Sequence, residues 1–441
     1  MDDREGDAVA PRHRPEGTRP EPLRPEPVRP DFDAYTAALD DAGLRTRPAA
    51  LLDLDLFRAN AAAMAARAAG TPIRVASKSL RVRRALDEAL AHPGYRGVLA
   101  FTLPEALWLA GHGADDVVVA YPSTDRAALA ALLRGEAHRH VTLMVDSPEH
   151  LGLLAAAARD AGSPSGRRFR VCLDLDASYA PVRTWPRGPR IGPLRSPVRT
   201  AEQAVRLARA AADAGVDVVG LMAYEGQVAG VADAASTPRG AAVRALRTLS
   251  IRDLATWRAE VVAAVRAALG QGSGPATGQG AGLEFVNGGG TGSLESTAAE
   301  DAVTELAAGS GFYGPELFQH YRGFRPAPAL HVLFDAVRRP GPRTVTVLGG
   351  GWTASGPAGP DRLPVPVWPP GLRYSATEGA GEVQTPLTGA AAAGIRLGDP
   401  VYFRHAKAGE PCERLGEVHV FSGGRITDTW PTYRGEGRAF L

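Results

Sequence analysis

Short apolar and β-branched runs alternate with Ala-, Leu- and Arg-rich stretches through the first three quarters of the chain. Eight runs are predicted as strands: Ile73–Ala76, Gly97–Phe101, Val117–Tyr121, Val141–Val145, Phe169–Asp174, Val216–Met222, Leu283–Val286 and Thr304–Ala308. Each is followed by a stretch of helical character, such as Ser79–Ala91 or Thr200–Ala214. Eight strands alternating with helices predict an α/β fold, in which a (β/α)8 barrel of the TIM type spans residues 49–323.

The pattern changes after about Gly323, where Gly and Pro separate short strand-like segments. These segments are Ala329–Phe334, Thr344–Leu348, Pro400–Phe403, Glu417–Phe421 and Arg425–Trp430. They predict a C-terminal β-rich domain over residues 324–441. At the other end, residues 1–30 are rich in proline and charge and predict a disordered tail, and residues 31–48 predict a helix that leads into the fold.

Composition narrows the class of protein. The 441 residues contain 50 Lys+Arg and 48 Asp+Glu, a net charge of +2, which argues against a dedicated nucleic-acid binder. No apolar run is long enough to span a bilayer, and no apolar segment behind the N-terminal charges indicates a secretory signal. Cys172 and Cys412 are too few for a disulfide framework. We therefore expect a cytoplasmic enzyme with neither a membrane nor a nucleic-acid partner.

Lysine is almost absent from this arginine-rich chain. Among the 50 basic residues, only Lys78 and Lys407 are lysines. Arginine stays protonated in proteins, whereas a lysine amine can lose its proton and attack a carbonyl group. Both lysines could be present by chance, without a function, but we expect at least one of them to take part in a reaction. Lys78 directly follows the first predicted strand, at the end of a barrel where functional groups gather.

Two glycine-rich loops follow the last two predicted barrel strands. The loops are NGGGTGS, Asn287–Ser293, and GSGFYG, Gly309–Gly314. Barrels often bind phosphate at these two places through backbone N–H groups, although an ordinary glycine turn is the alternative. The expected cofactor contacts here are Gly288, Gly289, Gly290, Thr291, Gly309, Ser310 and Tyr313. A phosphate site opposite a buried lysine in one barrel mouth suggests pyridoxal phosphate, with Lys78 bonded to it.

Other polar residues at the predicted strand ends are weaker candidates. Asp174 and Asp176 share one face of the fifth strand, where one of them can orient an arginine. Arg190 is a candidate for contact with the cofactor ring, and Tyr224 for cofactor contact or core packing.

The second domain has a polar cluster of its own near its C-terminal strands. By residue type, His405, Glu410 and Cys412 can bind a divalent ion such as zinc or manganese. The alternatives are direct contact with the substrate, or a loop with a satisfied histidine and a solvated Lys–Glu pair.

From Ala49 to Leu441 the chain resembles the fold-type III pyridoxal-phosphate enzymes, the alanine racemase-like superfamily. It is most similar to the D-threonine aldolase and D-serine dehydratase group, and within it to the actinobacterial-type amino acid deaminase/aldolase proteins. The carrying segments are VASKS, GLMAYEGQ, EFVNGGGTGS, GSGFYGP, EGAGEVQTP, HAKAGEPCERLGEVHV and PTYRGEG. The resemblance implies a barrel that binds pyridoxal phosphate, a C-terminal β domain, and a homodimer whose active site is completed by the partner's β domain.

The chain departs from this family at its metal site. The resemblance implies a divalent metal held by a histidine and, two positions on, by a cysteine or aspartate. His405 matches the histidine, but Lys407 occupies the second position, and an ammonium group cannot ligate a metal. The family's Glu-His-Gly stretch is replaced by Thr377–Glu378–Gly379. Either Glu410 or Cys412 replaces the lost ligand, or Lys407 supplies the positive charge itself.

Together these features predict a pyridoxal-phosphate lyase, either an aldolase or a dehydratase (deaminase), for a small β-hydroxy amino acid of D configuration. Lys78 would hold the cofactor and act as base, and His405 and Lys407 would act on the β-hydroxyl group. Racemisation is the first alternative, and it needs a second base such as Tyr402, Tyr433 or His405. A non-catalytic pyridoxal-phosphate homeostasis protein is the alternative of another class, although such proteins resemble the barrel alone. A phosphate-binding barrel without the cofactor is a further alternative.

Overall fold

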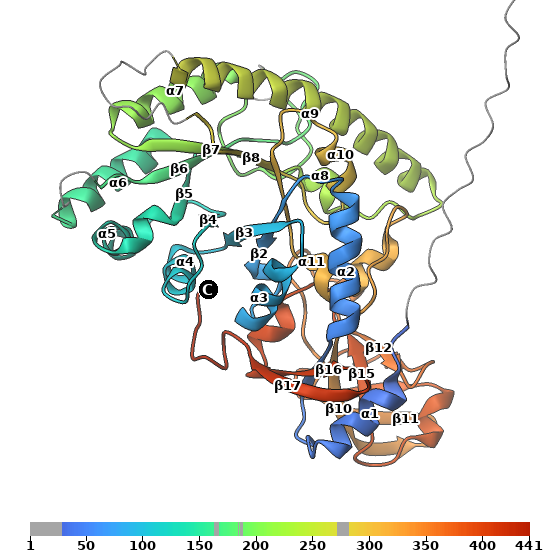
Figure 1. The fold of residues 1–441 in the computed structure, drawn as a ribbon. Helices are drawn as coiled ribbons and strands as arrows, with labels where there is room; N and C mark the ends of the chain where they lie inside the picture. Colours follow the sequence, from blue (N-terminus) through green and yellow to red (C-terminus); the bar gives the residue numbers. More distant parts are fainter. Residues whose placement is uncertain (1–28, 163–166, 184, 186–187, 271–281) are drawn as a thin grey trace, which may run out of the picture.

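The computed structural model describes residues 29–162, 167–183, 185, 188–270 and 282–441. The predicted disordered tail lies outside the described residues except for Arg29 and Pro30. Two units stand one above the other in Figure 1, a barrel ringed by helices and a smaller β domain. The predicted fold class, a parallel eight-stranded barrel with a second β domain, is confirmed.

The barrel is a closed parallel sheet whose strands follow one another in chain order. Its strands are β2 Ile73–Ala76, β3 Tyr95–Ala100, β4 Val117–Val119, β5 Val141–Val145, β6 Arg170–Asp174, β7 Asp217–Ala223, β8 Phe285–Gly288 and β9 Glu305–Ala308. The last strand closes the ring on the first, with Leu306 opposite Ile73. All eight predicted barrel strands are therefore present, with ends shifted by a few residues.

Helices surround the barrel strands. The longer ones are α2 Leu54–Arg67, α3 Arg83–Ala91, α4 Leu103–Ala110, α5 Arg126–Arg134, α6 Pro148–Asp160, α7 Ala201–Asp213 and α9 Pro238–Gly270. Shorter ones are α8 Gly226–Ala229, α10 Leu294–Ala298 and α11 Ser310–Tyr313, with 3₁₀ turns η1 Ser77–Ser79 and η2 Glu136–Arg139. Helix α7 begins where sequence analysis expected it, because Thr200 and Gln203 form a reciprocal capping box. No described helix is both long and apolar enough to cross a membrane.

The β domain is built from both ends of the chain. Strand β1, Ala49–Asp53, pairs antiparallel with β10, Leu330–Gly341, and parallel with β16, Glu417–Ser422. All five residues of β1 are buried, as expected for a central strand covered on both faces. The predicted barrel range of 49–323 therefore differs from the structure at its start: β1 belongs to the second sheet, and the barrel strands begin with β2.

The second sheet runs in the order β13-β14-β11-β10-β1-β16-β17, and β15 pairs with both β10 and β12. The remaining strands are β11 Thr344–Leu348, β12 Val365–Trp368, β13 Arg373–Tyr374, β14 Gln384–Thr388, β15 Pro400–Arg404 and β17 Arg425–Pro431. Four 3₁₀ turns complete this half of the chain: η3 Glu316–His320, η4 Pro360–Arg362, η5 Ala390–Gly394 and η6 Glu410–Glu413. The five strands predicted here are present, whereas β12, β13 and β14 were not predicted.

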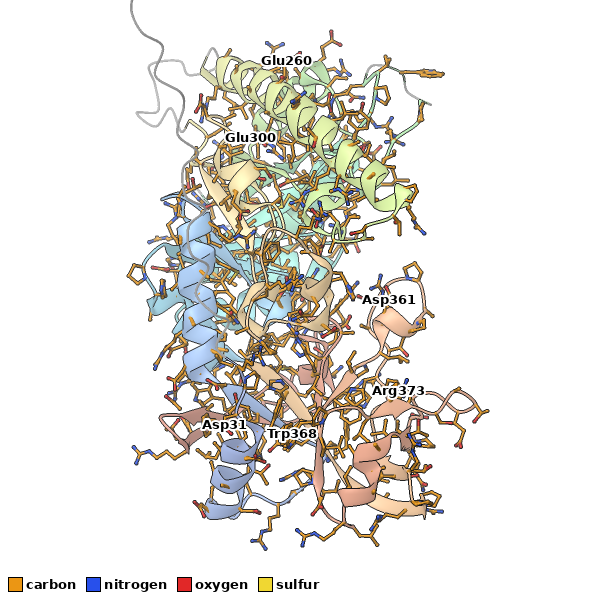
Figure 2. The ribbon with its side chains drawn as sticks, turned by 90° about the vertical axis from the view of Figure 1, so that its right-hand side faces the viewer. Asp31, Glu260, Glu300, Asp361, Trp368 and Arg373 are labelled. Atoms are coloured by element: carbon orange, nitrogen blue, oxygen red, sulfur yellow. The ribbon has the colours of Figure 1, made fainter. Side chains whose placement is uncertain are left out.

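Helix α1, Phe32–Asp41, packs against the β domain rather than the barrel (Figure 1). Its buried residues Tyr35 and Leu39 contact Leu51 of β1 within an apolar cluster of that domain. The Tyr35 hydroxyl donates to Asp53 Oδ2 at 2.6 Å, at the point where the chain leaves β1 for the barrel. At the start of the helix, Phe32 stacks on Trp368 of the second sheet with ring centroids 5.5 Å apart, in the region where Figure 2 labels Asp31 and Trp368. The predicted N-terminal helix therefore belongs to the β domain.

Substitution of Leu51 can test whether β1 is a central, buried strand, because the Leu51 side chain has no exposed surface. We expect Leu51→Ala to lower the free energy of unfolding by about 3 kcal/mol, from lost apolar burial and the cavity left behind. Denaturant unfolding measures this change. The control is Leu397→Ala, which truncates a leucine that is 64% exposed and should cost far less. Equal losses in the two variants would contradict a buried, central β1.

Candidate active site

One end of the barrel opens into a cavity of about 520 Å³, a size typical of small-molecule sites. Residues at or just after the carboxyl ends of six barrel strands line it: Lys78, Tyr121, Asp174, Tyr224, Asn287 and Gly309. The β domain supplies another wall, formed by Ser355, Arg362, Lys407 and Glu410. Figure 2 shows the loop that carries Asp361 on the side of the β domain that faces the barrel. This barrel-mouth cavity therefore contains side chains from both units.

Lys78 stands at the mouth of the barrel on turn η1, directly after β2. Its amine donates to the Tyr121 hydroxyl at 3.2 Å and lies 5.8 Å from the centre of that ring. Sequence analysis expected a buried lysine, but the Lys78 side chain is exposed while its neighbours Ser77 and Ser79 are buried. The exposure follows from its place on the cavity wall, and it leaves the amine accessible to a ligand.

The two glycine-rich loops meet on the same cavity. Gly289, Gly290, Thr291, Gly309 and Ser310 all line it. Thr291 Oγ1 joins the loops, because it accepts hydrogen bonds from Ser310 Oγ at 3.1 Å and from the backbone N–H of residue 311 at 3.3 Å. A Cβ atom at Gly290 would lie 2.8 Å from the Ala229 Cβ, so only glycine fits there without movement. Of the predicted contacts in these loops, Gly288 and Tyr313 lie outside the lining.

A buried charged network holds the first of these loops in place. Glu225, at the end of β7, accepts hydrogen bonds from Ser293 Oγ at 2.8 Å and from Gly289 N at 3.2 Å. Arg258 on α9 donates to the same carboxylate at 2.9 Å and also pairs with Glu300 at 2.5 Å. Sequence analysis missed this network, since nothing in the local pattern connects α9 with the loop.

Tyr224 and Arg195 form an aromatic and cationic part of the wall. Burial raises the pKa of Tyr224 to about 12, so its hydroxyl stays protonated near neutral pH. The Arg195 guanidinium lies 5.4 Å from the centre of the Tyr224 ring. Arg190, the arginine predicted to bear on the cofactor ring, donates instead to Asp176 at 2.8 Å and does not line the cavity. Arg195 was missed because spacing along a loop does not reveal side-chain direction.

The two aspartates after β6 have different surroundings. Asp176 pairs with Arg190 at 2.8 Å and with Arg199 at 3.3 Å. It is therefore the aspartate of the two that orients arginines. Asp174 faces the cavity, and burial together with nearby Asp146 raises its pKa to about 7. Asp174 is therefore a carboxyl group that can hold or release a proton near neutral pH.

Lys407 brings the second lysine of the chain to the same cavity from the β domain. Its amine donates to the Ser355 carbonyl at 2.6 Å, and Glu410 Oε1 accepts from the Ser355 N–H at 2.9 Å. Burial, and next the positive charge of Arg362, lower the pKa of Lys407. The family resemblance implied a wall from the partner's β domain; here the chain's own β domain already supplies one.

The remaining predicted site residues are buried beside the cavity. His405 lines a second cavity of about 290 Å³, which it shares with Lys407 and Glu410. Burial lowers the pKa of His405 to about 3 and raises that of the Cys412 thiol to about 12, so both are neutral. The Tyr313 hydroxyl donates to the Leu80 carbonyl at 3.1 Å.

The structure does not assemble the predicted metal ligands. Within the described ranges, no three His, Cys, Asp or Glu side chains form a group that could hold a metal ion. His405, Glu410 and Cys412 belong to neighbouring turns, but Glu410 is engaged by Ser355 and Cys412 is a buried neutral thiol. His405 Nε2 and Glu410 Oε2 are buried without a partner, but among the described residues no third donor completes a metal site with them.

One protein family and several known proteins are similar to this chain. Residues 52–258 match the family model of the alanine racemase N-terminal domain. A D-threonine aldolase from Arthrobacter sp. is 28% identical over 337 residues, which cover 75% of this chain and 77% of that protein. Among solved structures, D-threonine aldolase from Filomicrobium marinum superposes with a TM-score of 0.68 at 22% identity, covering 88% of this chain and 95% of the other.

A second solved structure has a related fold. D-threo-3-hydroxyaspartate dehydratase from Delftia sp. HT23 superposes with a TM-score of 0.64 at 21% identity, over 88% of this chain and 97% of the other. A variant of that dehydratase has been solved in a metal-free form. These two likenesses establish the fold over most of both chains.

Asp174 makes folding stability depend on pH. Its pKa of about 7 exceeds the ordinary 3.8, so the folded state binds its proton more tightly than the unfolded state. The resulting stabilisation is complete below about pH 4 and is lost as the pH rises to about 7. Relative to Asp174→Asn, which cannot titrate, the wild-type protein should lose up to about 4 kcal/mol over this range. Denaturant unfolding from pH 4 to pH 8 measures the difference, and parallel profiles for the two proteins would refute it.

Proposed function

Because residues 52–258 match the family model of the alanine racemase N-terminal domain, we propose that this protein is a pyridoxal-phosphate lyase that cleaves or dehydrates a β-hydroxy amino acid of D configuration. The observation that carries the proposal is Lys78, whose accessible amine shares one cavity with two glycine-rich loops and with Lys407. The 28% identity to a D-threonine aldolase supports a lyase among the activities of this family.

The residues around the barrel-mouth cavity fit the cofactor. Lys78 offers the amine for its aldehyde. In the joined loops at Gly289–Thr291 and Gly309–Ser310, Thr291 and Ser310 offer hydroxyl groups for its phosphate, and the glycines allow the phosphate to approach closely. When bound, pyridoxal phosphate supplies an electron sink for breaking a bond at the substrate Cα. The Arg258–Glu225 network would keep the phosphate loop in shape while the cofactor is loaded.

Lys78 is also the proposed base at the substrate Cα. Its amine is held by the Tyr121 hydroxyl, and Tyr121 faces the cavity with it. Tyr224, protonated because burial raises its pKa to about 12, acts as a hydrogen-bond donor rather than a base. The barrel side of the cavity would therefore bind the cofactor and move the Cα proton.

Lys407 is the group proposed to act on the β-hydroxyl. As an ammonium, it places a fixed positive charge in the cavity wall that faces the barrel, where it can stabilise an oxyanion or help a hydroxyl group leave. Its lowered pKa also makes the proton easier to donate. Aldol cleavage needs the β-hydroxyl proton removed and dehydration needs the hydroxyl to leave, and the position of Lys407 suits both. His405, buried and neutral, would act by supporting the turn that carries Lys407.

The alternatives receive less support. Racemisation needs a second base, yet Tyr402 bonds Thr36 at 2.8 Å, Tyr433 bonds Glu105 at 2.9 Å, and neither lines the barrel-mouth cavity. A β domain that contributes cavity residues argues against a homeostasis protein, and against a barrel that binds phosphate alone. The homodimer and the cytoplasmic location stay predictions.

Replacement of Lys78 tests the central proposal. Lys78→Ala removes the only amine on the barrel side of the cavity among the described lining residues, so the covalent cofactor adduct should disappear while the fold persists. The wild-type protein with pyridoxal phosphate should show a visible absorbance band that borohydride bleaches. Lys407→Ala is the matched control and should keep the band. A borohydride-reducible adduct in dialysed Lys78→Ala, together with full activity, would show that Lys78 is not the cofactor lysine.

The positive charge at the β-hydroxyl comes either from Lys407 or from a metal, and the two possibilities predict opposite effects of chelation on turnover. If Lys407 supplies the charge, Lys407→Ala should lower turnover of a β-hydroxy D-amino acid at least about tenfold, because loss of one preorganised charge costs ~3 kcal/mol at the transition state. Lys407→Arg should retain more activity, and exhaustive chelation should leave the wild-type rate unchanged. Turnover that chelation abolishes and added Mn²⁺ or Zn²⁺ restores would rule out this role for Lys407.

A further inference from the structure

The backbone that carries Lys78 ends at a strained residue. Arg81 has a φ of +54°, and Ala69 is the only other non-glycine residue in the described chain with a positive φ. A residue with a Cβ atom is unfavourable in this left-handed region, so contacts elsewhere must hold it there. Such strain often marks a functional site, and Arg81 lies three residues from Lys78 and lines the same cavity.

The Arg81 side chain connects the Lys78 turn to the β domain. Its Nε donates to the Lys78 carbonyl at 3.1 Å, and its Nη1 pairs with Glu413 of turn η6 at 2.7 Å. The arginine side chain is only 10% exposed, so water weakens this ion pair less than it would at the surface. Glu413 also pairs with Arg434 of the C-terminal segment at 2.7 Å, which fixes the acceptor.

Backbone contacts from the β domain and the C-terminal segment reach the same turn. The Tyr433 N–H donates to the Arg81 carbonyl at 2.9 Å. Gly409 lies so close to the Lys78 carbonyl that a Cβ atom there would stand 2.1 Å from the carbonyl oxygen. The Arg81 N–H in turn donates to the Ser77 carbonyl at 2.9 Å and closes the turn. The Lys78 backbone is therefore held from the β domain, whereas its amine stays accessible in the cavity beside the Tyr121 hydroxyl.

We propose that Arg81 and Glu413 form a positioning pair, which sets the Lys78 amine for covalent attachment of the cofactor and makes that attachment depend on the docked β domain. The inference rests on the proposed function of Lys78 and deepens it. Arg81 acts through the Lys78 backbone and is not assigned contact with the substrate or the cofactor. Loss of the pair would move the amine away from the Tyr121 hydroxyl without touching the two glycine-rich loops.

Two substitutions at Arg81 separate positioning from stability. Arg81→Ala keeps the Cβ atom and therefore the backbone strain, whereas Arg81→Gly relieves the strain, and both remove the guanidinium. A purely structural role predicts that Arg81→Gly performs better than Arg81→Ala in every measurement. A positioning role predicts that both variants lose cofactor attachment alike, whichever of them is the more stable.

The measurements use the full chain with added pyridoxal phosphate. Absorbance titration gives the dissociation constant of the borohydride-reducible adduct and the pH midpoint of its visible band, and denaturant unfolding gives stability. We expect both Arg81 variants to weaken attachment at least about tenfold and to shift the midpoint, because small displacements of a reacting group carry large costs. Glu413→Gln should change both values in the same direction. The control Arg84→Ala removes a mostly exposed arginine of α3 that pairs with Asp428 at 3.6 Å and lies over the Trp430 ring, and it should leave both unchanged.

The outcomes are distinct. If both Arg81 variants keep the wild-type dissociation constant of the cofactor adduct and the wild-type pH midpoint of its band, the positioning pair is overturned. Lys78 would still be the cofactor lysine. The positioning pair is also overturned if cofactor attachment follows stability, so that it is retained in Arg81→Gly and lost in Arg81→Ala. Arg81 would then have a structural role. No adduct in the wild-type protein would refute the proposed function, and this inference with it.

Discussion

The ion pair between Arg81 and Glu413 joins the Lys78 turn of the barrel to the β domain, and the proposed positioning of the Lys78 amine depends on it. A lysine that bonds to a cofactor and then moves protons needs a mobile amine on a fixed backbone. The exposed side chain of Lys78 provides the first requirement. The contacts from Glu413, Gly409 and Tyr433 to the turn provide the second, and all three come from the last third of the chain.

The C-terminal segment strengthens the same junction from the barrel side. Tyr433 donates to the buried carboxylate of Glu105 on α4 at 2.9 Å, and burial raises the pKa of Glu105 to about 7. Phe440 packs against Trp108 of α4 and against Phe101, and the C-terminus accordingly lies beside α4 in Figure 1. The barrel mouth is thus covered by the final segment of the chain, after that segment has left the second sheet.

The path of the chain explains why the two units act as one. The chain starts in the second sheet with β1, passes through all eight barrel strands, and returns to pair β10 and β16 on either side of β1. Because β1 leads directly into α2, the first barrel helix, the β domain cannot shift without moving the barrel wall. The side chains of Lys407 and Arg362 are therefore held across from barrel groups that come from a separate sheet.

Sequence patterns predicted most of this fold but not all of the site. The barrel strands were visible because each is a short buried apolar run followed by a helix. Strand β1 has the same appearance, AALLD before a helix, so only its pairing with β10 and β16 reveals that it belongs to the other sheet. Strands β12 to β14 lie in a Gly- and Pro-rich region where periodicity is weak. Both lysines were predicted as site residues because the chain contains no others, and the structure brings them to one cavity.

Long-range contacts account for what the sequence did not reveal. The choice between Arg190 and Arg195 depends on side-chain direction within one loop, and the Glu225–Arg258 pair joins residues 33 positions apart. The contacts of Arg81 with Glu413 and Tyr433 likewise join segments from opposite ends of the chain. Patterns along the chain report local structure and burial, whereas these interactions exist only between segments that folding brings together.

The role proposed for Lys407 would change the chemistry of the site without changing its fold. A divalent metal would bring two positive charges and no proton, and it would need several oxygen, nitrogen or sulfur donors around it. A lysine brings one charge and one exchangeable proton and needs only an acceptor, here the Ser355 carbonyl. Burial and Arg362 lower its pKa, so the same group can stabilise charge when protonated and release a proton when needed. Beside this site, burial lowers the pKa of His405 to about 3, because a buried imidazole is more stable uncharged than charged.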